Sequence, residues 1–136
     1  MDELDRKIIK TLKSDSRTSY VDLGKVVGLS EAAVRRRVQN LVKRKIIKKF
    51  TIDVDIGGAS AITLLTVNSL VATQQVSLRL QAVKGVDIVH EITGQYDVAV
   101  IMSAPNVAEV NKCIDDIRKV EGVNNTNTVI ILRTLS

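Results

Sequence analysis

Residues 19–45 read SYVDLGKVVGLSEAAVRRRVQNLVKRK, and this stretch predicts two helices joined by a tight turn. The first helix begins at Ser19, because Ser19 followed three residues later by Asp22 is a capping-box pattern, and it ends at Gly28. The turn Gly28-Leu29-Ser30 follows, and Ser30 is in place to cap the second helix. A helix, a short turn and a second helix form a helix-turn-helix, which we expect at about residues 21–40.

Another helix precedes this motif. Asp2 can cap a helix over about residues 3–13, in which Leu4, Ile8 and Leu12 recur at helical spacing. The N-terminal part of the chain therefore has three predicted helices, the last two of which form the helix-turn-helix.

The helix after Ser30 has two chemically different faces. Val34, Val38 and Leu41 form one apolar stripe, and the opposite face carries cations, an amide and the small Ala32. Arginine can read guanine, glutamine can read adenine, and alanine can meet a thymine methyl in a major groove wide enough for a helix. We weigh this against an ordinary amphipathic helix with a basic exterior, and the preceding turn and helices favour DNA recognition.

The segment that follows this helix predicts a wing. Lys48 and Lys49 begin it, and the alternation of apolar and polar residues up to Ile56 is typical of a half-buried strand. We expect the two lysines to contact phosphates. Gly57-Gly58 interrupts the pattern, so we expect a winged helix-turn-helix domain at residues 1–56 and a second domain at 57–136. The residues that we expect to contact DNA are Ser30, Glu31, Ala32, Arg35, Arg36, Gln39, Lys43, Lys48 and Lys49.

The distribution of charge supports a nucleic-acid partner for the first domain. The 136-residue chain has a net charge of +5, yet residues 1–55 carry +6 and residues 56–136 carry −1. Residues 35–49 contain eight Lys or Arg and no acidic residue. Runs of this kind are usually solvated helix faces, but here the cations coincide with the predicted helix-turn-helix.

Composition excludes several other classes of protein. One cysteine and one histidine exclude an internal disulfide, a cysteine-rich zinc site and a histidine metal cluster, so we expect no metal or cofactor. Apolar runs such as 98–102 are far shorter than the ~18–20 residues of a membrane span. The acidic start, MDELD, differs from an export signal, and we expect a cytoplasmic protein with no membrane partner.

The second half of the chain predicts two βαβ units. Strand-like runs occur at 61–71, 86–93, 96–103 and 126–133, with helices before Gly85 and Gly122, and Asn106 caps the second of these helices. The order βαββαβ indicates a ferredoxin-like fold, so the whole protein is α+β. In the strands at 86–93 and 96–103, the residues that point to either face of the sheet are apolar, whereas the two helices can cover only one sheet face. We therefore expect at least a homodimer.

A candidate small-molecule site lies between the second and third of these strands. Residues 92–97 read ITGQYD. One interpretation is that the glycine has a structural role alone, in a tight hairpin between the two strands. The functional alternative is that backbone N–H groups around Gly94 bind the carboxylate of a small zwitterion and that the Asp97 carboxylate binds its amine.

The two halves together resemble the leucine-responsive/asparagine-responsive (Lrp/AsnC) family of feast/famine transcription regulators. The resemblance spans nearly the whole chain. The matching residues are Asp2, Leu4, Asp5 and Ile8; Val27, Gly28, Leu29 and Ser30; Val34, Arg37, Val38 and Leu41; and Thr93, Gly94, Tyr96 and Asp97.

The resemblance implies a DNA-binding regulator that dimerises through its sheets, often assembles as an octamer, and binds an amino-acid effector between dimers. By the same resemblance, the effector site comprises Gly94, Gln95, Tyr96 and Asp97, with Thr126 and Thr128 from a neighbouring subunit. The effector itself, the target genes, and the choice between activation and repression stay open.

Two residues depart from the family pattern. Lys45 stands where the family usually has glycine before the wing, which adds a charge beside the DNA. Gly24 stands where alanine is usual, which weakens the second helix by about 1 kcal/mol.

Other functions fit the sequence less well. An enzyme is not expected, because His90 and Glu91 are adjacent in a strand and face opposite ways, and Cys113 lies beside a core stripe with no histidine near it in sequence. Three scattered aromatic residues give no platform for stacking RNA bases. The alternative that stays open is a non-specific architectural DNA-binding protein without a ligand.

Overall fold

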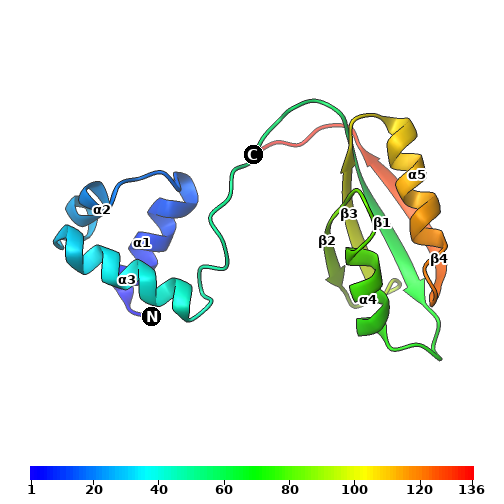
Figure 1. Cartoon of the computed structure of the whole chain (residues 1–136), viewed down its shortest axis with the longest axis horizontal. Helices are drawn as coiled ribbons and strands as arrows, with labels where there is room; N and C mark the ends of the chain where they lie inside the picture. Colours follow the sequence, from blue (N-terminus) through cyan, green and yellow to red (C-terminus); the bar gives the residue numbers. More distant parts are fainter. The chain divides into compact units, whose positions relative to one another are not determined.

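Three helices form at the start of the chain because a side chain caps each of them. The computed structural model describes residues 1–136, with α1 (Glu3–Ser14), α2 (Tyr20–Val27) and α3 (Glu31–Lys43) in the first unit (Figure 1). Asp2, Ser19 and Ser30 each accept a hydrogen bond from the backbone N–H three residues on. The three predicted helices and their caps are confirmed.

The three helices enclose one small apolar core. Each contributes a stripe at helical spacing, so that the side chains meet between the helices. The buried residues of this core are Ile8 and Leu12 of α1, Leu23 and Val27 of α2, and Val34, Val38 and Leu41 of α3. The face of α3 predicted to be apolar is thus buried, which leaves its opposite face exposed.

The turn between α2 and α3 depends on two glycines. Gly28 has a φ of 71°, a conformation that glycine adopts without strain. At Gly24, a Cβ atom would overlap the carbonyl oxygen of Leu29, whose N–H donates to the Gly24 carbonyl at 3.0 Å. Gly24 therefore allows the Leu29 carbonyl to pack closely against α2. This contact offsets part of the stability that glycine costs the helix.

The end of α3 contains a strained residue. Lys45 has a φ of 57° and is the one non-glycine residue with positive φ. Beyond it, the N–H groups of Ile46 and Ile47 both donate to the Leu41 carbonyl, at 2.9 and 3.1 Å. Lys45 thus occupies the left-handed position that commonly ends a helix and that glycine usually fills.

The strand predicted at Lys48–Ile56 does not form, so that part of the wing prediction is wrong for the single chain. Residues 48–56 are neither helix nor strand, and the apolar side chains that were expected to be half-buried are exposed, from 53% for Phe50 to 89% for Ile56. A strand requires a neighbour to pair with its backbone N–H and C=O groups, and no segment of this chain supplies one.

The second unit is a four-stranded antiparallel sheet with two helices. The contacts divide the chain into Met1–Val54 and Asp55–Ser136. The sheet order is β2-β3-β1-β4, which is that of the predicted ferredoxin-like fold. Its elements are β1 (Ala59–Val67), α4 (Thr73–Gln81), β2 (Val86–Glu91), β3 (Val98–Ala104), α5 (Val107–Arg118) and β4 (Val123–Ile131). Neither these helices nor those of the first unit are long and apolar enough to cross a membrane.

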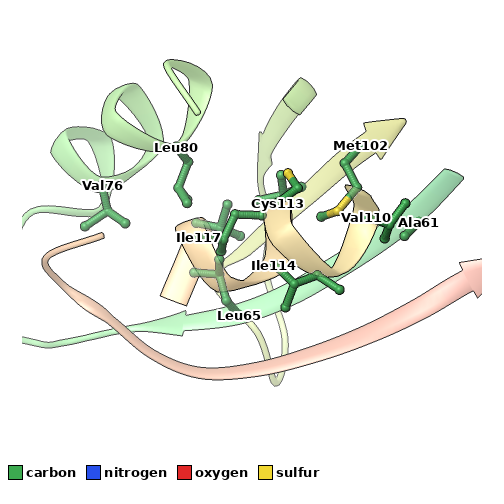
Figure 2. Packing of buried hydrophobic residues seen from close by; sticks show 11 residues of the cluster. Ala61, Leu65, Val76, Leu80, Met102, Val110, Cys113, Ile114 and Ile117 are labelled. Atoms are coloured by element: carbon green, nitrogen blue, oxygen red, sulfur yellow. The ribbon is translucent and has the colours of Figure 1, made fainter. Parts of the chain in front are cut away.

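Helices α4 and α5 pack on one face of the sheet. Figure 2 shows Val76 and Leu80 of α4, and Ile114 and Ile117 of α5, gathered with Leu65 of β1. Other side chains from this face of β1 and β3 complete the core. They are Ala61, Val98, Val100 and Met102.

The other face of the sheet has no helix over it. Pairing places Ile62 of β1 beside Ile101 of β3 and Val129 of β4, and the same face continues onto Ile88 of β2. The side chains of Ile88 and Val129 are each 48% exposed. The sheet is therefore apolar on both faces, as the sequence predicts, and one of these faces is uncovered in the single chain.

Candidate nucleic-acid interface and effector site

Helix α3 presents a mostly polar surface to solvent. Because Val34, Val38 and Leu41 are buried, every residue that the sequence assigns to base or phosphate contact on α3 lies on the exposed side. These exposed residues are Ser30 at the N-cap and Glu31, Ala32, Arg35, Arg36, Gln39 and Lys43 along the helix. An α-helix with such a face has the dimensions to enter a major groove.

One arginine of this surface is engaged within the first unit. Arg35 forms an ion pair with Glu31 one turn earlier, and its guanidinium lies 5.3 Å from the centre of the Tyr20 ring. The cation–π contact joins α3 to the start of α2. Part of the Arg35 charge is therefore already balanced by Glu31.

A second arginine fastens α1 to α3. The Arg37 Nη1 atom lies 2.7 Å from Asp2 Oδ2 and 2.9 Å from Asp5 Oδ1, and those two carboxylates also cap the first turn of α1. The hydrogen bond from the Asp5 N–H, together with the Arg37 guanidinium, lowers the pKa of Asp2. The same contacts with Asp2 and Asp5 raise the pKa of Arg37. Arg37 therefore has a structural role that the sequence did not indicate beyond its place in the family pattern.

The remaining arginines near α3 line a polar cavity of about 240 Å³. Its walls are Asp5, Arg36, Arg37, Asn40, Leu41 and Arg44. Arg36 and Arg44 form no ion pair within 4.0 Å, in contrast to Arg35 and Arg37. Asn40 and Arg44 were not among the predicted contacts, although the four-residue spacing of 36, 40 and 44 places them on one side of the helix.

Lys48 and Lys49 lie beyond α3 in the exposed segment that forms no strand. They border a larger cavity of about 760 Å³ between this segment and the end of α1, with Ile9, Leu12 and Phe50 in its walls. The two lysines are accessible to phosphates, but no strand fixes their position as the predicted wing would have done.

The loop expected to bind the effector lies at one end of the sheet. Gly94 has a φ of 109° and open space beside it, and Gln95 is exposed. Asp97 is half-buried and serves the fold directly, because its Oδ2 accepts from the Val67 N–H at 2.8 Å and its own N–H donates to the Leu65 carbonyl at 2.9 Å. The sequence did not indicate this brace between the loop and the end of β1.

Thr126 and Thr128 of β4 lie at or near the end of the sheet that carries this loop. Leu65 of β1 pairs with Val98 on one side and with Thr126 on the other, so β1 separates the loop from the threonines of the same chain. Thr126 Oγ1 accepts from Arg118 Nε at 3.3 Å, and the hydroxyls of Thr128 and Thr63 are 2.8 Å apart.

A side chain that the sequence does not indicate connects this loop to β4. Asn127 Nδ2 donates to the Tyr96 hydroxyl at 3.3 Å. No signal in the sequence marks Asn127, because the contact depends on the register of β4.

The groups considered for catalysis are far from an enzymatic arrangement. His90 pairs with Ala99 and Glu91 with Val98, so their side chains lie on opposite faces of the sheet. Cys113 is buried in the core, and burial raises the pKa of its thiol, with a further contribution from Asp116 and Asp87. A raised pKa disfavours the nucleophilic thiolate. No three His, Cys, Asp or Glu residues come together as metal ligands.

Comparison with known proteins assigns both units. The AsnC-type helix-turn-helix domain matches residues 1–42, and the Lrp/AsnC ligand binding domain matches residues 60–136. The chain belongs to the Lrp/AsnC family of transcriptional regulators. The α2–α3 motif of this Lrp/AsnC regulator therefore lies within its helix-turn-helix domain, and the loop at Gly94 lies within its ligand-binding domain.

Individual relatives resemble this Lrp/AsnC regulator over nearly their full length. The HTH-type transcriptional regulator LysM of Sulfurisphaera tokodaii is 40% identical over 134 residues, which cover 98% of this chain and 96% of that protein. The HTH-type transcriptional regulator FL11 of Pyrococcus horikoshii is 34% identical over 137 residues, covering 98% and 91%.

A solved structure has the same fold. The feast or famine regulatory protein of Mycobacterium tuberculosis, complexed with L-methionine, matches with a TM-score of 0.88 and 23% identity over 99% of this chain and 94% of that chain.

Proposed function

We propose that this Lrp/AsnC regulator recognises specific sites on double-stranded DNA with α3, and that a free amino acid controls its assembly and its affinity for those sites. The observation that carries the proposal is the exposed polar face of α3 in a chain whose second unit is a ligand-binding domain of the same family. We place its activity in the cytoplasm, where such an intracellular signal and DNA meet.

The division of work on the DNA follows from the chemistry of the exposed residues. Ala32 and Gln39 suit contact with base edges, because alanine accepts a thymine methyl and glutamine pairs with adenine. Lys43, Lys48 and Lys49 suit phosphates, and Ser30 and Glu31 stand at the helix end that enters the groove first. Arg35, with its charge partly balanced by Glu31, sits at the edge of this surface.

A homodimer is supported by the uncovered apolar face of the sheet. Ile62, Ile88, Ile101 and Val129 would be buried if a second copy covered that face, and burial of apolar surface favours association. The exposed row from Phe50 to Ile56, with its unpaired backbone, is a second surface that another copy could cover. By resemblance to the family, dimers assemble further, up to octamers.

The dimer can be tested with a substitution on the uncovered face and a control at an exposed polar residue of the same strand. Val129→Asp places a charge on the uncovered face and should give monomers, whereas Asn124→Asp, at an exposed site near the start of the same strand, should leave the assembly unchanged. Analytical ultracentrifugation of both variants at micromolar concentration measures this. If Val129→Asp sediments as the parent does, a different surface holds the copies together.

The effector site is proposed at Gly94–Asp97. Backbone N–H groups around Gly94 and Gln95 can bind a carboxylate. Asp97 Oδ1, whose partner oxygen is occupied by Val67, can accept from an ammonium group. Tyr96 bounds the loop, and Thr126 and Thr128 of a neighbouring subunit would supply hydroxyls. The L-methionine complex of the Mycobacterium tuberculosis protein supports an amino acid as the class of ligand.

Two measurements test the function as a whole. Footprinting on genomic fragments at physiological salt should give bounded sites, whereas an architectural protein would protect DNA without boundaries. A thermal-shift screen of the twenty amino acids should identify a subset that stabilises the protein, by about 2.7 kcal/mol at 100 times the Kd. Unbounded protection together with no stabilising amino acid would support the architectural alternative.

A further inference from the structure

The polar cavity beside α3 has the composition of an anion site. Of its six lining residues, three are arginines and one is an acid, and Asn40 adds an amide that can donate. Arg36 and Arg44 are exposed and form no ion pair, so their charges are free for a ligand. Two arginines on either side of an amide suit a tetrahedral oxyanion, because guanidinium groups bind phosphate oxygens in pairs.

Arg37 neutralises the Asp5 carboxylate, which is the one negative charge in the cavity that would repel an anion. Asp5 lines the cavity, and a free carboxylate would repel a phosphate. The Asp5 side chain is 12% exposed, its Oδ1 accepts from Arg37 Nη1 at 2.9 Å, and its Oδ2 accepts from the Asp2 N–H at 3.3 Å. The carboxylate is thus already satisfied within the first unit, and Arg36, Asn40 and Arg44 are the groups left to face a ligand.

The position of the cavity on α3 indicates which anion it meets. An α-helix with its side chains is about 10–12 Å across, and the major groove is about 12 Å wide, so the flanks of a helix in the groove lie against the sugar-phosphate backbones. The cavity lies on a flank of α3, and Gln39 lies on the exposed face that we propose to meet the bases.

We propose that Arg36, Asn40 and Arg44 form a cradle for one backbone phosphate of the bound DNA. This inference rests on the proposed function, since it assumes that α3 enters the groove. It assigns Arg36 to the DNA backbone, whereas the sequence alone suggests that Arg36 reads a base. The cradle fixes the depth and rotation of α3, and Gln39 then reads the bases.

The test compares DNA binding by five full-length proteins. They are the parent, Arg36→Ala, Arg44→Ala, the double variant Arg36→Ala/Arg44→Ala, and the control Arg6→Ala/Lys10→Ala. Arg6 and Lys10 are exposed cations of α1 that form no ion pair and do not line the cavity, so the control removes the same charge. The probes are a duplex selected by the parent from a random library and a random duplex of equal length.

The cradle predicts a distinctive salt dependence. Each single variant should bind both duplexes about tenfold more weakly or worse. The double variant should flatten the slope of log K against log salt by about 0.9, the value for one phosphate, and the control should leave the slope unchanged. If the slope for the double variant decreased by about twice that value, the two arginines would contact two separate phosphates, and the cradle would be overturned. If Arg36→Ala lost affinity for the selected duplex alone, Arg36 would be assigned to a base contact, and the cradle would be overturned.

A chemical change in the DNA gives an independent measure. Single methylphosphonate substitutions in the selected duplex remove the charge of one phosphate at a time. One position should weaken binding by the parent and the control but not by the Arg36→Ala/Arg44→Ala variant. If every position that weakens the parent weakens this variant equally, the cradle is wrong. If the parent selects no preferred duplex at all, the failure lies with the proposed function.

Discussion

Single residues within helices determine how the DNA-binding unit is held together. Arg37 joins both capping carboxylates of α1 to α3, and Gly24 allows the Leu29 carbonyl to approach α2. These contacts connect residues far apart in the chain or across a tight turn. Their effect is therefore tertiary.

Lys45 provides a prediction about stability. Lys45→Gly should raise the free energy of unfolding by about 1 kcal/mol, because a left-handed φ of 57° costs a residue with a Cβ more than it costs glycine. Lys45→Ala is the control, since it removes the charge and keeps the strain, and it should give no such gain. Urea unfolding of the three proteins measures the difference. Equal stability of the glycine and alanine variants would contradict the explanation from backbone strain.

The Asp2 carboxylate predicts a dependence of stability on pH. Its folded-state pKa is lowered from the usual 3.8, so the stability that it contributes is present above about that pH and is lost as the pH falls through the lowered value. Asp2→Asn keeps a good N-cap but removes the charge. The parent should be more stable than Asp2→Asn at pH 6, and the difference should shrink as the pH falls below 3.8. A difference that is constant between pH 6 and pH 2 would exclude the ion pair as its cause.

At the scale of elements, α3 and the segment after it suit different kinds of contact with DNA. The regular helix holds its exposed side chains in fixed register, which base reading requires. Residues 48–56 lack a strand partner in the single chain, so their lysines are held less strictly and suit contacts that depend on charge alone.

This difference predicts opposite effects of two substitutions. Gln39→Ala should weaken binding to a selected duplex by about 1–3 kcal/mol and scarcely change binding to a random duplex, because it removes a base contact. Lys48→Ala should weaken both and flatten the salt slope by about 0.9. Fluorescence anisotropy over a salt series measures both quantities. Equal losses on both duplexes for Gln39→Ala would assign Gln39 to the backbone.

At the scale of the whole molecule, the proposed effector would act on DNA binding through assembly. A ligand with equal affinity for two assemblies cannot shift the balance between them, so a controlling amino acid must bind one of them more tightly. A site completed by a neighbouring subunit meets this condition, because its full set of contacts exists only in the larger assembly. A coupling of about 1–3 kcal/mol would change operator affinity roughly 5–150-fold.

Asp97→Asn tests this coupling without disturbing the fold. The amide oxygen of asparagine can still accept from the Val67 N–H, but the negative charge that would bind an ammonium group is lost. We expect the variant to bind DNA as the parent does and to lose its response to the stabilising amino acid, both in mass distribution and in operator affinity. A response with an unchanged midpoint would place the effector elsewhere. Asp97→Ala is less informative, because it also removes the brace on β1.

The sequence by itself determined the order of the helices and of the strands of the sheet, four of the helix caps, and the apolar stripes that form the cores of the two units. These features depend on residues within a few positions of one another, and periodicity reports them directly. Helix caps at Asp2, Ser19, Ser30 and Asn106 were predicted for that reason. The sheet order also followed, because the βαββαβ pattern is compatible with few topologies.

Only the tertiary structure decided which polar groups are already engaged and which are free. Arg35, Arg37 and Asp97 all have the chemistry of binding residues, yet their partners in the fold are Glu31 with Tyr20, Asp2 with Asp5, and Val67. Arg36 and Arg44 have no such partners. The strand predicted after α3 was wrong for a related reason, since pairing needs a neighbour that local alternation cannot supply. Partners of this kind come from positions distant in the sequence or from another chain, so local patterns do not contain them.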